Sequence, residues 1–174
     1  MKPQPITLRD SDRLGITARL TVPLFPIARA IDLAADGERF DTRLSTWLER
    51  QTPIFAWQFI ELAPSQLHAR TEGCGKKKID GLNTLLDVLK LPRLGTPLDN
   101  DLVRHRLSRT VHPRNQPEMD LRFAMFDWLV AWEHMPRSEE TGRTDYRQFV
   151  ACDERMLALA RKYLTDIAEN DGVA

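Results

Sequence analysis

The sequence predicts a mainly α-helical protein, a single-domain bundle of about six to seven helices over residues 1–174. Apolar residues recur at helical spacing after residue 25, and prolines and glycines stand where helices begin and end. With 42% hydrophobic and 29% charged residues, the composition is typical of a globular chain. A chain of this length buries roughly 70% of its unfolded surface, so we expect one shared core.

Residues 1–24 are predicted to form an extended N-terminal segment. Between Ile16 and Val22, apolar residues alternate with polar ones, which is the period of a half-buried strand. A second alternating stretch, Ile54–Leu62, leaves open a short hairpin between the two segments. We expect helix for this second stretch, because the Thr52-Pro53 pair before it is a typical helix start.

Residues 25–135 are predicted to form the helical body, and it includes a basic region at 66–115. The expected helices are Pro26–Ala35, one through Leu44 and Leu48, one from Pro53, one through Ile79 and Leu89, one from Pro97, and Asn115–Met135. The last of these is apolar around most of its circumference, so we expect it to be central and buried among other helices.

A loop at 136–144 is predicted to lead into a C-terminal amphipathic helix at 145–169. Phe149, Met156 and Tyr163 recur every seven residues in this helix and form a stripe about two side chains wide. We expect the stripe to pack on the core, and the alternative is that it packs on another protein.

The net charge of zero conceals an uneven distribution along the chain. Residues 1–65 carry 8 basic and 8 acidic side chains, residues 66–115 carry 10 and 5, and residues 116–174 carry 7 and 12. Such asymmetry indicates an anionic partner for the middle region and a cationic partner for the last third. The alternative is that the two regions pair with each other within the fold.

The stretch GCGKKKID, residues 73–80, places glycines beside Lys76, Lys77 and Lys78. A phosphate-binding P-loop needs GxxxxGK followed by Ser or Thr. Here the first lysine is followed by another lysine, and Arg70 occupies the first glycine position, which argues against nucleotide hydrolysis by this element. We expect a cationic loop that leads into a helix N-terminus and favours an anion, and the alternative is a solvated surface turn.

A second cationic stretch, RHRLSRTVHPR, lies on or just after the helix expected from Pro97. Each basic side chain that neutralises a phosphate releases counterions, so about six contacts would give salt-sensitive, largely sequence-independent binding. Nothing here distinguishes DNA from RNA, and the alternative is that these arginines pair with the acidic last third. The candidate nucleic-acid-binding residues are Lys76, Lys77, Lys78, Arg104, Arg106, Arg109 and Arg114.

The chain has no recognisable catalytic or metal-binding motif. Its four histidines form no HxxxH or HExxH pattern, and Cys74 and Cys152 form no CxxC pair. Asp120, Asp127 and His134 follow one line along the long apolar helix, and we expect them on its exposed or Arg-paired side. We therefore expect no catalytic residue, no cofactor and no metal site.

The chain begins without an apolar run of signal length, and it has no uncharged apolar span of about 18 residues. We therefore expect no membrane association. Two cysteines far apart in sequence are consistent with free thiols in a reducing compartment, so we expect a cytoplasmic location.

The sequence thus favours a non-enzymatic, nucleic-acid-associated helical protein, either a DNA-binding regulator or a backbone-gripping subunit of a nucleoprotein complex. The alternative is a protein–protein interaction module, such as an adaptor, an inhibitor, an immunity-like partner or a homo-oligomer. This alternative requires an exposed apolar patch, and we expect it at the stripe through Phe149, Met156 and Tyr163 or around Trp47.

Overall fold

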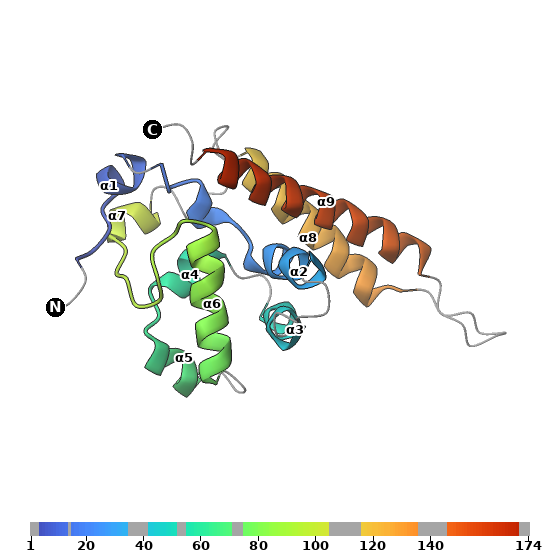
Figure 1. The fold of residues 1–174 in the computed structure, drawn as a ribbon, viewed down its shortest axis with the longest axis horizontal. Helices are drawn as coiled ribbons and strands as arrows, with labels where there is room; N and C mark the ends of the chain where they lie inside the picture. Colours follow the sequence, from blue (N-terminus) through green and yellow to red (C-terminus); the bar gives the residue numbers. More distant parts are fainter. Residues whose placement is uncertain are drawn as a thin grey trace.

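The computed structural model describes residues 4–13, 15–34, 42–51, 55–70, 75–104, 116–135 and 146–170 (Figure 1). In these ranges the regular elements are all helical. They are α1 (Leu8–Arg13), the short 3₁₀ helix η1 (Arg19–Thr21), α2 (Leu24–Ala34), α3 (Thr42–Arg50), α4 (Ala56–Ile60), α5 (Pro64–Arg70), α6 (Lys76–Val88), α7 (Asn100–Leu102), α8 (Gln116–Glu133) and α9 (Arg147–Glu169).

Six of the described helices have seven or more residues, namely α2, α3, α5, α6, α8 and α9. This confirms the mainly α-helical bundle, although the described residues form nine α-helices where about six to seven were predicted. The predicted loop at 136–144 lies outside the described residues. The C-terminal helix begins at Arg147 and ends at Glu169, close to its predicted bounds.

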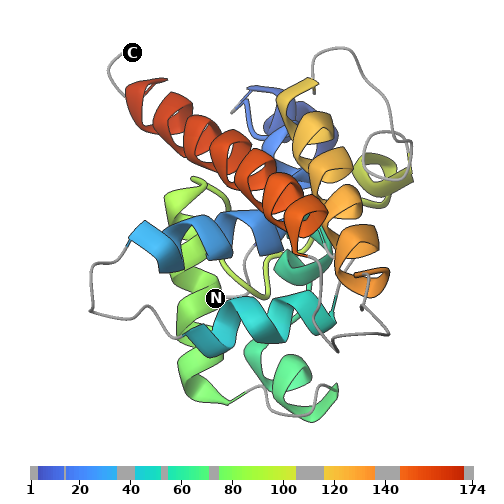
Figure 2. The ribbon, with the colours of Figure 1, turned by 90° about the vertical axis from the view of Figure 1, so that its right-hand side faces the viewer.

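Helix α2 is the hub of the bundle, since it contacts α3, α6, α8 and α9 (Figure 2). Its residues Leu24, Ile27 and Ala28 are completely buried. This corrects the expectation that the helix at 115–135 is central, because α8 packs on α9 and α2 along one side only. Helix α8 is therefore apolar over more of its surface than its contacts with α2 and α9 cover.

Helices α8 and α9 run antiparallel side by side in both views (Figures 1 and 2). The buried hydroxyl of Tyr163 donates to the Glu118 carboxylate at 2.6 Å, near the start of α8 and the end of α9. At the opposite end, the Trp132 and Phe149 rings lie 5.3 Å apart. Met156 and Tyr163 are buried between these ends, so the predicted α9 stripe packs on the core.

A charged contact joins the first third of the chain to the last. The Arg29 guanidinium donates to both carboxylate oxygens of Asp153, at 2.7 and 3.0 Å, and the Trp128 indole N–H donates to the same carboxylate at 2.8 Å. The Arg29 guanidinium also lies 5.8 Å from the centre of the Trp128 ring. Because both the ion pair and the indole donor satisfy Asp153, this part-buried carboxylate links α2, α8 and α9.

The possible N-terminal strand or hairpin does not form in the described residues. Within the stretch predicted as extended, α1 and η1 form instead, and Leu20 and Thr21 are both buried although a half-buried strand would point them to opposite faces. The two alternating segments meet only at an isolated bridge between Pro23 and Phe55. Proline has no N–H to extend a ladder, and α4 at Ala56–Ile60 confirms the helical choice for the second segment.

The connection after α6 folds back through two residues with positive φ. Lys90 has φ 54° at the helix end, where the Leu91 N–H donates to the Leu86 carbonyl at 2.9 Å, and Gly95 has φ 87°. The Lys90 ammonium donates to the Ile167 carbonyl at 2.8 Å, near the end of α9. The ends of α6 and α9 are therefore joined by one side chain.

The helix expected from Thr96-Pro97 begins later, at Asn100. The Asp99 carboxylate accepts from the Asp101 N–H at 2.9 Å and so caps α7, whereas the Thr96 hydroxyl donates backwards to the Arg93 carbonyl at 2.8 Å. Asp is a stronger N-cap than Thr, which accounts for the shift.

Candidate binding surfaces

The three lysines lie in the first turn of α6 and not in a loop, because the helix begins at Lys76 after Gly75 as N-cap. Lys76 and Lys77 are exposed and Lys78 is half-buried. The first turn has no acidic side chain, so three cations sit at the positive end of the helix dipole. The predicted cationic stretch thus begins the helix itself, and its binding of an anion stays a prediction.

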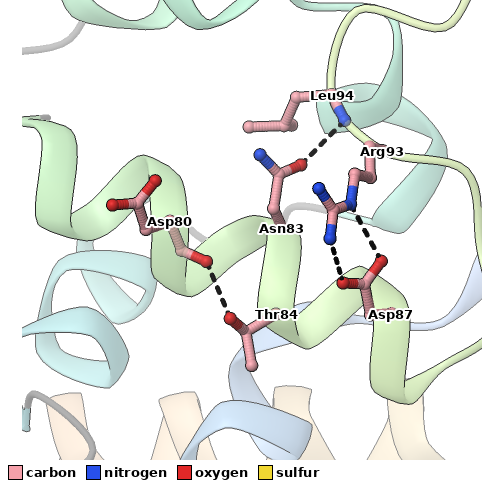
Figure 3. A network of polar contacts seen from close by, with 6 residues as sticks. All are labelled: Asp80, Asn83, Thr84, Asp87, Arg93 and Leu94. Atoms are coloured by element: carbon pink, nitrogen blue, oxygen red, sulfur yellow. Dashed lines mark hydrogen bonds and ion pairs between the residues drawn. The ribbon is translucent and has the colours of Figure 1, made fainter.

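The solvent-facing side of α6 is occupied by local polar contacts (Figure 3). Arg93 donates to both oxygens of the Asp87 carboxylate, at 3.2 and 2.8 Å, and Asn83 accepts from the Leu94 N–H at 3.1 Å. The hydrogen bond from Arg93 holds the pKa of Asp87 below its usual value. Arg93, a basic residue of the region 66–115, is thus paired with an acidic residue of the same region.

Of the candidate basic residues that the structure describes, the three lysines and Arg104 do not lie together. Arg104 is exposed and follows α7, whereas the lysines lie at the far end of α6 beside α5, and the two sites are well separated in both views (Figures 1 and 2). Arg106, Arg109 and Arg114 lie outside the described residues. The described acids Asp127 and Asp153 form ion pairs with Arg155 and Arg29, neither of which belongs to the basic region 66–115.

In the described part of the chain, no three His, Cys, Asp or Glu side chains are placed to hold a metal ion. Asp127 and His134 are exposed, as expected for the line through Asp120, Asp127 and His134. Asp127 lies 3.5 Å from Arg155, and the His134 ring contacts the Val130 carbonyl at 3.0 Å. Cys152 is a free, half-buried thiol. Cys74, His105 and His112 lie outside the described residues.

A cavity of about 260 Å³ lies between the start of α8 and the end of α9. Beside it, Glu118 accepts the Tyr163 hydroxyl through one oxygen, and its other carboxylate oxygen is buried without a hydrogen-bond partner. Burial and the Glu118 charge raise the pKa of Tyr163 well above its usual value, so the phenol keeps its proton and remains a donor. The lining residues are Pro117, Asp120, Leu159, Lys162, Tyr163 and Asp166.

The outer face of α8 carries a row of exposed apolar side chains. Phe123, Phe126 and Val130 are 56%, 38% and 55% exposed, and half-buried Met119 continues the row by one turn. Their spacing of three and four residues places them on one side of the helix. Residues 121, 124, 125 and 128 are buried on the opposite side. Helix α8 thus has two apolar faces, and only one packs on the core.

Two exposed acidic side chains and two basic side chains flank this row. Asp127 and Glu133 are exposed on α8, while the Arg122 guanidinium turns inward and lies 4.3 Å from the centre of the Phe55 ring. Burial lowers the pKa of Arg122. Arg155 of α9 is the basic group that reaches Asp127, at 3.5 Å. The row and the charges beside it are called the α8 outer face below.

Comparison with protein-family models, with curated proteins and with solved structures found no match. The choice among the surfaces therefore rests on their own chemistry. The predicted apolar patches are largely covered, because Trp47, Met156 and Tyr163 are buried and Phe149 is half-buried. The α8 outer face is instead the exposed apolar row that the interaction hypothesis requires. Its signal is visible in the sequence, since Met119, Phe123, Phe126 and Val130 form a second helical stripe within α8.

No described helix is both long enough and apolar enough to cross a bilayer. The two apolar faces of α8 are interrupted by Asp120, Arg122, Asp127 and Glu133. Charged side chains are costly at the centre of a membrane, so an aqueous protein partner suits the exposed row better than lipid tails do.

Proposed function

We propose that this protein is a protein-interaction module that docks a partner on the α8 outer face. The observation that carries the proposal is the line of Phe123, Phe126 and Val130, which are exposed on a helix whose other side is buried. Isolated exposed apolar residues are common on protein surfaces, but a contiguous row of apolar side chains that includes two phenylalanines is typical of an interface core.

The gain from covering this row is substantial. Moving a fully exposed Phe or Val side chain out of water stabilises a complex by about 1.5–3 kcal/mol, and these side chains retain about half of their surface for a partner. Aromatic residues also lose little conformational entropy on binding, because they have few rotatable bonds. Phe123 and Phe126 are therefore the expected anchors of the interface.

The experiment compares partners captured by three forms of the tagged protein. We expect the double variant Phe123→Ser/Val130→Ser to lose a partner that both the wild type and the control Val88→Ser retain. Val88 suits the control because it is 41% exposed and lies on α6, away from the row. Unfolding midpoints establish that all three forms fold. Identical captured proteins from all three folded forms would refute the proposal.

A second candidate function is nucleic-acid binding, and the exposed cationic first turn of α6 favours it. Lys76 and Lys77 add two exposed positive charges to the positive end of a helix that has no acid in its first turn. Retention of labelled DNA and RNA across a salt series tests this candidate. Absence of binding to both nucleic acids at low salt would exclude it.

We place the protein in the cytoplasm as part of this proposal. The thiol of Cys152 is free and half-buried, which suits a reducing compartment. Fractionation of cells that produce the protein would test the location, and recovery in a secreted or membrane fraction would contradict it.

A further inference from the structure

We propose that the partner of the α8 outer face is a basic amphipathic helix. This inference rests on the proposed function and specifies the chemistry of the partner. It follows from the shape of the apolar row, from the charges that flank it, and from the repulsion that the same charges create between two copies of this chain.

The row has the dimensions of a helix–helix contact. Met119 to Val130 spans about three helical turns, or roughly 16 Å, because each residue of a helix rises about 1.5 Å. Side chains spaced by three and four residues form ridges, and a second helix packs its own ridges between them. A partner helix with apolar residues at positions i, i+3 or i+4, and i+7 would cover Phe123, Phe126 and Val130 together.

The flanks of the row select the charge of that helix. Asp127 and Glu133 point their charges to solvent, whereas Arg122 directs its guanidinium away from the face and onto Phe55. Arg155 lies 3.5 Å from Asp127, but both side chains are more than half exposed, at 65% and 58%. An exposed pair of this kind is weak, so a lysine or arginine of the partner can compete for Asp127.

The same charges disfavour a second copy of this chain as the occupant. In a two-fold symmetric dimer the same surface is used by both subunits, so the exposed Asp127 and Glu133 of both copies would lie in one interface. Like charges across an interface oppose its formation. Residues 116–174 as a whole carry 7 basic and 12 acidic side chains, which acts in the same direction.

Three synthetic 18-residue helical peptides test the inference by fluorescence anisotropy with the full chain. The first two share one leucine stripe and differ in flanks of lysine or of glutamate, and the third is a scrambled lysine peptide without a stripe. We expect only the lysine peptide with the stripe to bind. Phe123→Ser/Val130→Ser should abolish this binding, and Val88→Ser should leave it unchanged.

The charge variant Asp127→Asn/Glu133→Gln isolates the electrostatic part. It should weaken binding of the lysine peptide about three- to tenfold at low salt, and the difference should shrink at high salt as the charges are screened. Sedimentation of the wild type alone should show a monomer.

The other outcomes each overturn a defined statement. Equal binding of the lysine and glutamate peptides, lost in Phe123→Ser/Val130→Ser, would overturn the basic partner while leaving the docking surface intact. Equal binding of the scrambled peptide would overturn the helical stripe. A dimer that Phe123→Ser/Val130→Ser disrupts would assign the face to a second copy. Absence of binding by every peptide would overturn the inference, and the captured-partner experiment would then decide the proposed function separately.

Discussion

Helices α6 and α8 both lay one face on the core, but they meet solvent in different ways. The outer side of α6 is largely polar, since Arg93 donates to Asp87 and Asn83 accepts from the Leu94 N–H, and Val88 is its one exposed large apolar side chain among the described residues. The outer side of α8 presents Phe123 and other apolar side chains to water. The contrast shows that an apolar residue on a helix indicates burial only where the fold supplies a neighbour for that face.

This contrast separates folding from binding within one helix. The inner face of α8 supports the core through Trp128, which contacts Phe25 and Phe149 with ring centres 4.9 and 5.3 Å apart. The outer face has no comparable role in the isolated chain.

Trp128→Ala should destabilise the fold by about 3–5 kcal/mol, because it opens a cavity in the core and removes the indole donor from Asp153. Phe123→Ala, on the other face of the same helix, should change the free energy of unfolding by less than about 0.5 kcal/mol. Urea unfolding measures both variants. A large loss of stability for Phe123→Ala would show that the outer face belongs to the core.

Tyr163→Phe should cost about 1–3 kcal/mol, because it leaves the buried Glu118 carboxylate without its one described hydrogen-bond donor. Adding Glu118→Gln should recover part of this loss, since a neutral amide is cheaper to bury than an unpaired charge. A double-mutant cycle by urea unfolding checks the coupling. Strict additivity of the two changes would contradict it.

The same pair predicts a pH dependence. The folded pKa of Tyr163 is raised, so its contribution to stability is complete below the unfolded value of about 10 and is lost as pH rises further. Above pH 10 the wild type should lose up to about 1.4 kcal/mol per pH unit through this group, and Tyr163→Phe should lack that slope. Unfolding curves between pH 8 and 11 measure the difference, and parallel profiles would refute it.

Lys90→Ala should destabilise by about 1 kcal/mol, because the ammonium no longer binds the Ile167 carbonyl. Lys90→Gly should cost less, because glycine adopts the positive φ of 54° without the steric penalty of a side chain. Thermal unfolding compares the two variants. Equal losses would mean that the backbone at this helix end is unstrained.

The triple variant Lys76→Gln/Lys77→Gln/Lys78→Gln should show the smallest effect on folding, within about 0.5 kcal/mol for each substitution. It removes three positive charges from the positive end of α6, where cations oppose the helix dipole. If these lysines bind phosphates, the slope of log affinity against log salt should shrink by about 2–3. An unchanged slope in the folded variant would exclude them as a site.

The fold was largely predictable because its main helices carry strong local signals. The sevenfold repeat of Phe149, Met156 and Tyr163 correctly indicated a face that packs on the core. Two local effects account for the wrong predictions. Asp99 caps α7 in place of Thr96, and the alternating segment between Ile16 and Val22 has no strand to pair with. These outcomes depend on neighbours in the fold, which the spacing of apolar residues in the sequence does not identify.

The candidate site was less predictable than the fold. Phe123 and Val130 are visible as apolar residues in the sequence, but the pattern cannot say which of two apolar helix faces a neighbour covers. Only the placement of α2 and α9 on the other side of α8 leaves them exposed. The lysines of α6 show the reverse case, because their exposure was predictable from charge while their helical conformation was not.

The ion pair between Arg29 and Asp153 can form only late in the synthesis of the chain. The two residues are separated by 124 positions. At about 5–20 residues per second, a ribosome takes roughly 6–25 s to add the second after the first. During that interval α2 has neither its ion-pair partner nor the face of α9 that covers it. The buried face of α2 therefore stays uncovered in the nascent chain until α9 has been synthesised. A chaperone that shields apolar segments would bind the chain in this interval.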